Sequence, residues 1–214
     1  DALVSAEDAD GLLAEALRSK LPAGVIADVG AGTGRVTRLL AGHATHSILL
    51  ERAAPMLEVA KERLQPLGLS FETHVADARA LPLDAQSTDA AVAGWVFGHF
   101  RHWMPDGWRE EVDQALAEME RVVRVGRLGR PQLVIETLGT GHETPRTHEA
   151  LDEYFGYLES LGFERSWVRT DYVFEDVEAA ATTLGGFFGE AMAEKIRTHA
   201  WARVPECTGL WWRA

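Results

Sequence analysis

The segment from Val25 to Arg35, VIADVGAGTGR, constrains this chain more than any other part of the sequence. Its first residues form a largely apolar run typical of a buried parallel strand, and a helical pattern begins directly after Gly34. Glycines at such a junction permit a sharp turn with positive φ and let a ligand approach the backbone. The free N–H groups of the following helix face the same place. The segment therefore predicts a binding site for a nucleoside cofactor.

The spacing of the glycines separates two kinds of cofactor. A dinucleotide-binding turn has the pattern G-x-G-x-x-G, whereas this turn has G-x-G-x-G, so that Arg35 stands where the third glycine would be. Asp28 lies inside the strand before the turn, where a buried carboxylate needs a cationic or hydrogen-bonding partner. The pyrophosphate of a dinucleotide would be repelled there. The ammonium and sulfonium of S-adenosylmethionine suit such an acid, and the segment favours that cofactor.

This pattern resembles the first motif of the class I S-adenosylmethionine-dependent methyltransferases, (D/E)-x-G-x-G-x-G. The resemblance extends to three later segments in the family's order. It implies that the acid ending the second apolar run holds both ribose hydroxyls, that a third segment holds the adenine, and that the end of a fourth strand lies beside the methionine moiety. The cofactor-binding residues expected from it are Asp28, Gly30, Gly32, Gly34, Glu51 with the adjacent Arg52, Asp77, Ala78, Gly94 and Trp95.

The alternation of strand and helix patterns predicts an α/β fold. By resemblance this is a single-domain, Rossmann-like, seven-stranded sheet, mainly parallel with one antiparallel strand and with helices on both faces. We expect one domain over 1–214, made of an N-terminal helix (1–22), a cofactor-binding core (23–137) and a substrate-side part (138–214). The strands expected are 24–29, a run ending at 51, 70–76, 89–95, 131–137, 164–174 and 208–213. The helices are one beginning at a cap in 5–8, one beginning at Pro55, 106–124, 147–161, and 175–199 interrupted near Gly185-Gly186.

The composition of the chain limits the kinds of partner that it is expected to bind. A formal net charge of −12 disfavours a nucleic-acid partner, because phosphate binding relies on clustered Lys and Arg. The single cysteine, Cys207, excludes an internal disulfide framework and offers no zinc cluster, and we expect no bound metal. No apolar run is long enough to cross a membrane. We predict a cytoplasmic protein without a membrane partner; the oligomeric state stays open, with a homodimer among the alternatives.

Methyl transfer depends chiefly on positioning. Orientation supplies roughly 7–11 kcal/mol, more than the 10²–10⁴-fold of a general base. Two histidines are candidate catalytic residues. His99 follows the fourth strand where, by resemblance, many small-molecule methyltransferases carry a histidine, and its alternative role is capping or packing. His142 lies in the loop Thr137–Thr144 after the fifth strand, and Glu136 directly before this loop is a further candidate; the alternative is a solvated loop.

An aromatic set is open to two interpretations. It comprises Tyr154, Phe155 and Tyr157 with Trp167 and Tyr172. The first three would either roof an apolar substrate or form ordinary core. The sequence as a whole predicts a methyltransferase acting on oxygen or nitrogen of a small-molecule metabolite by in-line displacement. The alternatives are a methyltransferase for RNA or protein, and a non-catalytic S-adenosylmethionine-binding protein.

Overall fold

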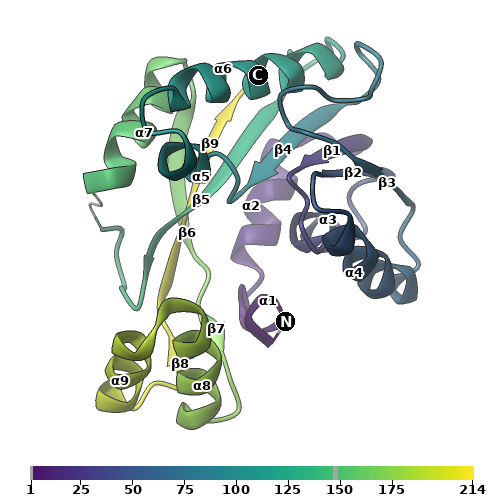
Figure 1. Ribbon diagram of the computed structural model, residues 1–214. Helices are drawn as coiled ribbons and strands as arrows, with labels where there is room; N and C mark the ends of the chain where they lie inside the picture. Colours follow the sequence, from purple (N-terminus) through teal and green to yellow (C-terminus); the bar gives the residue numbers. More distant parts are fainter. Residues whose placement is uncertain (1, 147–148) are drawn as a thin grey trace. The chain divides into compact units, whose positions relative to one another are not determined.

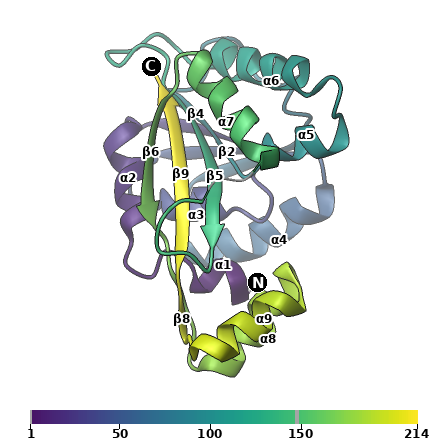
Figure 2. The same cartoon turned by 90° about the vertical axis from the view of Figure 1, so that its left-hand side faces the viewer.

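The computed structural model describes residues 2–146 and 149–214 (Figure 1). Its main sheet has seven strands in the order β3-β2-β1-β4-β5-β9-β6. These strands are β1 (Val25–Val29), β2 (His46–Glu51), β3 (Phe71–Val75), β4 (Ala90–Gly94), β5 (Gln132–Thr140), β6 (Glu164–Arg169) and β9 (Glu206–Arg213). The pairings from β3 to β5 are parallel. β9 runs against β5 and β6 on its two sides (Figure 2). The expected mainly parallel sheet with an antiparallel member is confirmed.

The helices around this sheet follow from the apolar stripes of their sequences. α3 (Arg35–Leu39) and α4 (Ala54–Leu64) lie on one side of the sheet, with the short turn η1 (Gln65–Leu67) after α4; α5 (Gly98–Trp103), α6 (Trp108–Val122) and α7 (Glu149–Ser160) lie on the other (Figure 1). Because both faces are covered, the central strand β4 is an apolar run whose first four residues are buried. α4 starts with Pro55 in its first turn, as expected.

The chain divides into two compact units. We call the one that holds most of the sheet the core unit (Leu17–Glu136, Glu149–Ser166, Leu210–Ala214) and the other the second unit (Asp1–Ala16, Thr137–His148, Trp167–Gly209). The chain passes between the units after Ala16 and again within β5, β6 and β9. The crossing after Glu136 comes next to the end of the predicted cofactor-binding core. The single-domain boundaries themselves stay a prediction.

The second unit has a small apolar core of its own. It contains α1 (Ala2–Ala6), α8 (Val177–Phe188), α9 (Glu190–His199) and the antiparallel pair β7 (Tyr172–Val173) and β8 (Arg203–Val204). Tyr172, Leu184 and Ile196 are among the buried side chains that hold these elements together. This core joins elements that lie far apart in the sequence and so stabilises the second unit.

The expected N-terminal helix is wrong in one respect, because two helices occur there, α1 and α2 (Leu12–Lys20). Asp8 adopts a positive φ of 55° between them, which ends the first helix. Its two carboxylate oxygens accept hydrogen bonds from Leu13 N at 2.8 Å and Ala14 N at 3.1 Å. Asp8 therefore caps α2 rather than taking part in one continuous helix.

Three other boundaries differ from expectation. The helical region breaks at Gly189, with φ of 93°, and not at Gly185-Gly186. Gly185 lies inside α8. A Cβ there would stand 2.7 Å from Ala193 Cβ, so the glycine permits close packing of α8 on α9. The stretch 164–174 is divided between β6 and β7, and β5 continues to Thr140 into the segment expected to be a loop.

Candidate functional site

The turn between β1 and α3 depends on its three glycines. Gly30, Gly32 and Gly34 have φ of 69°, 54° and 81°. The N–H of Gly30 donates to Leu50 O at 2.7 Å and so ties the turn to β2. A Cβ on Gly34 would lie 2.8 Å from Leu64 Cδ1. The left-handed backbone and the close packing together require glycine, and they leave the backbone of the turn open to a ligand.

Asp28 is buried in β1, with 1% of its surface exposed. Its Oδ2 accepts from Thr37 Oγ1 at 2.7 Å and from Thr37 N at 3.1 Å, which fixes the start of α3. Burial raises the pKa of this carboxyl to about 6. Its Oδ1 is buried and has no hydrogen-bond partner among the described residues. An orphaned buried oxygen next to the turn fits a site that takes a polar or cationic ligand group.

Glu51 ends β2 beside the same turn. Its Oε2 accepts from Gly32 N at 3.1 Å, and its Oε1 accepts from Ala53 N at 2.9 Å. An ionised carboxylate offers about four acceptor sites, so about two remain. Two acceptor sites match the two hydroxyls of a ribose diol. Arg52, the next residue, is exposed, and its guanidinium carbon lies 5.9 Å from the centre of the Trp103 ring.

Asp77, after β3, is paired with Arg79. It accepts from Arg79 N at 3.0 Å, Nε at 2.7 Å and Nη2 at 2.6 Å. The Arg79 guanidinium holds the pKa of this carboxyl at about 2, and the same guanidinium also bonds Glu111 at 2.5 Å. Three of about four acceptor sites are thereby used. One remains for a donor such as the amino group of an adenine, with Ala78 half-buried beside it.

The end of β4 lies close to the glycine turn. A Cβ on Gly94 would stand 2.8 Å from a methyl of Val36 in α3, so this position also needs glycine. Trp95 has a φ of 56°, a left-handed conformation that costs a non-glycine residue about 1–3 kcal/mol. The guanidinium carbon of Arg35 lies 3.3 Å from the centre of its ring. Strain and a cation–π contact thus fix this corner of the site.

The predicted cofactor residues therefore share one neighbourhood in the core unit. β1, β2, β3 and β4 are parallel neighbours, so their carboxyl ends open on the same edge of the sheet. The buried orphaned oxygen, the open glycine backbone and the spare acceptors of two carboxylates fit S-adenosylmethionine. Their individual contacts with that cofactor stay a prediction.

His99 lies in α5, and its side chain is exposed. Its ring stacks on Trp103 with 5.3 Å between ring centres. The structure gives the imidazole no polar partner among the described residues, so neither ring nitrogen is engaged. A catalytic role for His99 stays a prediction.

The residue before it, Gly98, is held by a buried carboxyl. Gly98 N donates to Glu136 Oε1 at 3.0 Å, and Tyr154 OH donates to the same oxygen at 3.1 Å. Burial raises the pKa of Glu136 to about 7, and burial beside this carboxyl raises that of Tyr154 well above its usual range. Through these two hydrogen bonds Glu136, the last residue of β5 that belongs to the core unit, is connected to the start of α5 and to α7.

The aromatic set is divided between the two units. Tyr154 and Phe155 are buried in the core unit, which confirms the core interpretation for these two. Tyr157 donates to Asp113 at 2.6 Å, and burial raises its pKa to about 12. Trp167 is exposed and Tyr172 belongs to the core of the second unit. A place over a substrate stays a prediction for Tyr157.

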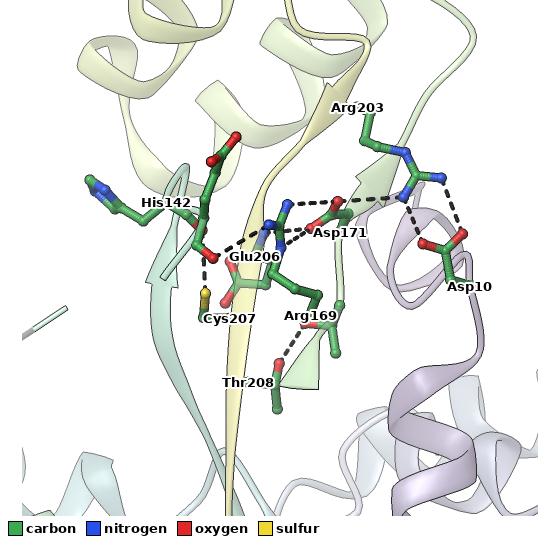
Figure 3. Close-up of polar contacts among 10 residues, drawn as sticks. Asp10, His142, Arg169, Asp171, Arg203, Glu206, Cys207 and Thr208 are labelled. Atoms are coloured by element: carbon green, nitrogen blue, oxygen red, sulfur yellow. Dashed lines mark hydrogen bonds and ion pairs between the residues drawn. The ribbon is translucent and has the colours of Figure 1, made fainter. Parts of the chain in front are cut away.

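His142 lies in the second unit, just after β5. Its Nε2 is 3.1 Å from Arg146 Nη1 and 3.3 Å from Lys195 Nζ. Burial and these two cations lower the pKa of the imidazole. Cys207 Sγ donates to the carbonyl of His142 at 3.3 Å, and Figure 3 shows the ring pointing away from that sulfur. Because its Nε2 faces two donors, His142 is poorly placed to accept a proton, and its catalytic role stays a prediction.

Several polar residues of these sites have no clear sequence signal. Thr37 is a polar residue among the buried positions of the short helix α3, and no motif predicts its bonds to Asp28. Arg79 is marked by its position two residues after Asp77. Nothing in the sequence marks Lys195, which reaches His142 across 53 positions. The sequence singled out Arg35 only because it stands where a dinucleotide-binding turn has its third glycine. Its contact with the Trp95 ring was not expected.

Within residues 2–146 and 149–214, no group of three or more His, Cys, Asp and Glu side chains could hold a metal ion. No helix in the same part has the length and apolar character needed to cross a membrane.

Comparison with known proteins agrees with the glycine turn and the sheet. Residues 27–128, which include every predicted cofactor-binding residue, match the family described as "Methyltransferase domain". Just under half of the chain is therefore similar to a methyltransferase domain. Among curated relatives, the ubiquinone/menaquinone biosynthesis C-methyltransferase UbiE of Bordetella parapertussis is 33% identical over 104 residues. The match spans 47% of this chain and 37% of that relative, so the chain matches little more than a third of the relative's length.

Solved structures share the methyltransferase fold over nearly the whole chain. A putative type II methyltransferase from Anaeromyxobacter dehalogenans aligns with a TM-score of 0.63 and 19% identity, covering 95% of this chain and 94% of its own. The [4+2]-cyclase SpnF gives 0.60 and 20%, covering 96% and 81%. A geranyl diphosphate methyltransferase in complex with SAM gives 0.54 and 15%, covering 95% and 85%. At these identities the likeness concerns the fold alone.

Proposed function

We propose that this protein is an enzyme that transfers a methyl group from S-adenosylmethionine to a small-molecule metabolite by in-line displacement. The observation that carries the proposal is the state of Glu51. It is fixed by two backbone N–H groups, one of them in the glycine turn, and keeps two acceptor sites unused. A carboxylate held in this way is preorganised for a ribose diol and adds little entropy cost on binding.

The other residues of the turn support a cofactor with a cationic amino-acid end. Asp28 brings a buried oxygen without a partner, and a positive group nearby would lower its raised pKa. When bound, S-adenosylmethionine supplies a methyl group on a positively charged sulfur. The protein's task is then to hold an acceptor atom in line with that methyl, and orientation of this kind is worth roughly 7–11 kcal/mol.

Glu136 supports this task in the core unit. Its bond to Gly98 N fixes the start of α5, and α5 carries His99. His99 has a free imidazole and is our candidate for accepting a proton from the acceptor atom. Its replacement by Ala should lower kcat by about 10²–10⁴ and leave cofactor affinity nearly unchanged. An unchanged kcat would remove His99 from the mechanism.

The acceptor we propose is a small molecule, since the net charge of −12 opposes a nucleic acid. The attacked atom is oxygen or nitrogen in our proposal. The likeness to a relative named as a C-methyltransferase adds carbon as an alternative. A cytoplasmic location also remains part of the proposal.

The cofactor assignment is tested by calorimetry with S-adenosylmethionine on Glu51→Ala. Loss of two hydrogen bonds to a charged group, at about 1.5 kcal/mol each, should weaken binding by about a hundredfold. Glu58→Ala is the matched control, because Glu58 lies on the exposed side of α4 and pairs only with Lys61. A Glu51 variant that binds as tightly as the Glu58 variant would contradict the assignment.

A second candidate function is cofactor binding without methyl transfer. It is favoured by one fold neighbour, whose name is that of a [4+2]-cyclase. The two are separated by following S-adenosylhomocysteine while the protein is incubated with S-adenosylmethionine and a panel of hydroxyl, amine and activated-carbon acceptors. Formation of S-adenosylhomocysteine that depends on an acceptor supports methyl transfer. Its absence with every acceptor, while the cofactor binds, supports the second function.

A further inference from the structure

The second unit contains two cations that no carboxylate neutralises among the side chains that the structure describes. Lys195 Nζ, on α9, donates to Gly141 O at 2.8 Å and lies 3.3 Å from His142 Nε2. Arg146 Nη1 lies 3.1 Å from the same imidazole nitrogen. The remaining side-chain contact of Lys195 is with the Trp201 ring, 5.6 Å away. Two positive groups thus converge on one neutral ring.

This arrangement is unusual for a chain in which acids greatly outnumber bases. Several other guanidinium groups face carboxylates, as Arg79 does with Asp77 and as Arg197 does with Glu178 on the neighbouring helix. Asp171, an acid of the same unit, has cationic partners of its own. Figure 3 shows Asp171 between Arg169 and Arg203, and the His142 ring pointing away from that network.

The backbone around the cations is built for close approach. Gly141 has a φ of 74°, and a Cβ there would lie 3.0 Å from Lys195 Nζ. Gly141 N donates to Pro205 O at 2.7 Å, and Arg146 N donates to Leu138 O at 2.8 Å. These bonds hold His142 and Arg146 in place on either side of a short loop. The cation from α9 then completes the group.

We infer that His142, Arg146 and Lys195 form a binding site for a doubly charged oxyanion, such as the phosphate group of a small molecule. A phosphate monoester carries about −1.5 to −2 charges at pH 7, which balances two cations. In the free protein His142 Nε2 lies within hydrogen-bond distance of both cations and stands where an oxygen of the anion would be. The lowered pKa values of His142 and Lys195 agree with this crowding of positive charge. The site goes beyond the proposed methyl transfer and does not depend on it.

Inorganic phosphate is the probe, titrated into the protein by calorimetry at pH 7 and low ionic strength, without S-adenosylmethionine. The wild type should bind it saturably. Lys195→Met and Arg146→Gln should each weaken binding by about tenfold, the loss expected for one charge-assisted hydrogen bond. Arg197→Gln is the control, because it removes one positive charge from the same helix α9 outside the group. It should change the affinity by less than about twofold.

Two further measurements identify the ligand chemistry and the residue. Acetate, a monoanion, should bind about tenfold more weakly than phosphate if two cations set the affinity. Phosphate should also raise the pKa of His142, followed by the imidazole resonance that is missing in His142→Gln. The inference is overturned if the wild type takes up phosphate without saturation. It is also overturned if Arg197→Gln loses as much affinity as Lys195→Met, or if the His142 resonance titrates identically with and without phosphate.

Discussion

Glu136 offers the sharpest test of the electrostatics in the core unit. It is buried, and its Oε1 accepts from Gly98 N and from Tyr154 OH. Glu136→Gln keeps a carbonyl oxygen for these two donors but removes the ability to ionise. Because glutamine has nearly the shape of a protonated glutamic acid, the substitution should preserve the packing. It isolates the free energy of burying one negative charge.

The magnitude follows from the raised pKa. Glu136 holds its proton up to about pH 7 in the folded protein, whereas its ordinary pKa is 4.5. Between these values the folded state binds one more proton than the unfolded state, so stability falls as the pH rises. The full loss is about 3 kcal/mol at 1.36 kcal/mol per pKa unit. Between pH 5 and pH 8 it amounts to about 2.5 kcal/mol, and above pH 8 it stays constant.

The assay is urea unfolding followed by tryptophan fluorescence, repeated from pH 5 to pH 8. The two proteins should be similar in stability at pH 5, and the variant should be more stable by about 2.5 kcal/mol at pH 8. With an m-value of about 2 kcal/mol/M this raises the urea midpoint by about 1 M. Asp28, whose pKa is also raised, contributes to both curves, so the difference between the curves reports Glu136.

Glu164→Gln removes an exposed carboxylate at the start of β6 and serves as the control for a change in net charge. Its unfolding curve should follow that of the wild type. The reasoning is refuted if the stability difference between Glu136→Gln and wild type is the same at pH 5 and pH 8 within about 0.5 kcal/mol. It is also refuted if the variant is less stable at pH 8.

Two further substitutions test the glycine turn. Thr37→Val removes the hydroxyl that donates to buried Asp28 and should cost about 1.5–3 kcal/mol in urea unfolding, while Thr37→Ser should restore most of it; equal stability of the Val and Ser variants would contradict the role of that bond. Gly34→Ala adds both left-handed strain and a methyl 2.8 Å from Leu64 Cδ1, whereas Gly42→Ala adds strain of the same kind in open space. Gly34→Ala should therefore lower stability by about 1–3 kcal/mol more than Gly42→Ala, and an equal loss would show that packing against α4 does not require the glycine.

The sequence predicted what depends on local pattern. The strand before the glycine turn and the run that ends at Glu51 are largely apolar because helices cover both faces of the sheet. A local run of apolar residues was therefore enough to predict where these two strands lie. The glycine spacing predicted the left-handed turn, because few other residues adopt that backbone. The same locality allowed cofactor-binding residues to be predicted one by one, and their contacts with the cofactor stay a prediction.

What the sequence could not give depends on side chains that meet across the fold. The two N-terminal helices were expected as one, because the break depends on Asp8 adopting a positive φ and turning back to cap α2. The break after α8 was placed at the wrong glycine, since Gly185 serves packing against Ala193 while Gly189 makes the turn. Two glycines close together do not tell which one bends the chain and which one allows contact.

The same reasoning explains why the methyl donor could be predicted and the acceptor could not. Binding of the methyl donor needs carboxylate oxygens that can still accept hydrogen bonds, and their number is set by neighbouring residues. Glu51 already accepts two hydrogen bonds from nearby backbone N–H groups, and Asp77 accepts three from Arg79, two positions later. Other groups depend on long-range pairs. Burial raises the pKa of Glu136, which accepts from Tyr154, and His142 lies beside Lys195, 53 positions away. A change of residue at Lys195 would alter what His142 can bind without altering any motif around His142. The chemistry of these two groups therefore depends on pairs that no single segment of this sequence contains.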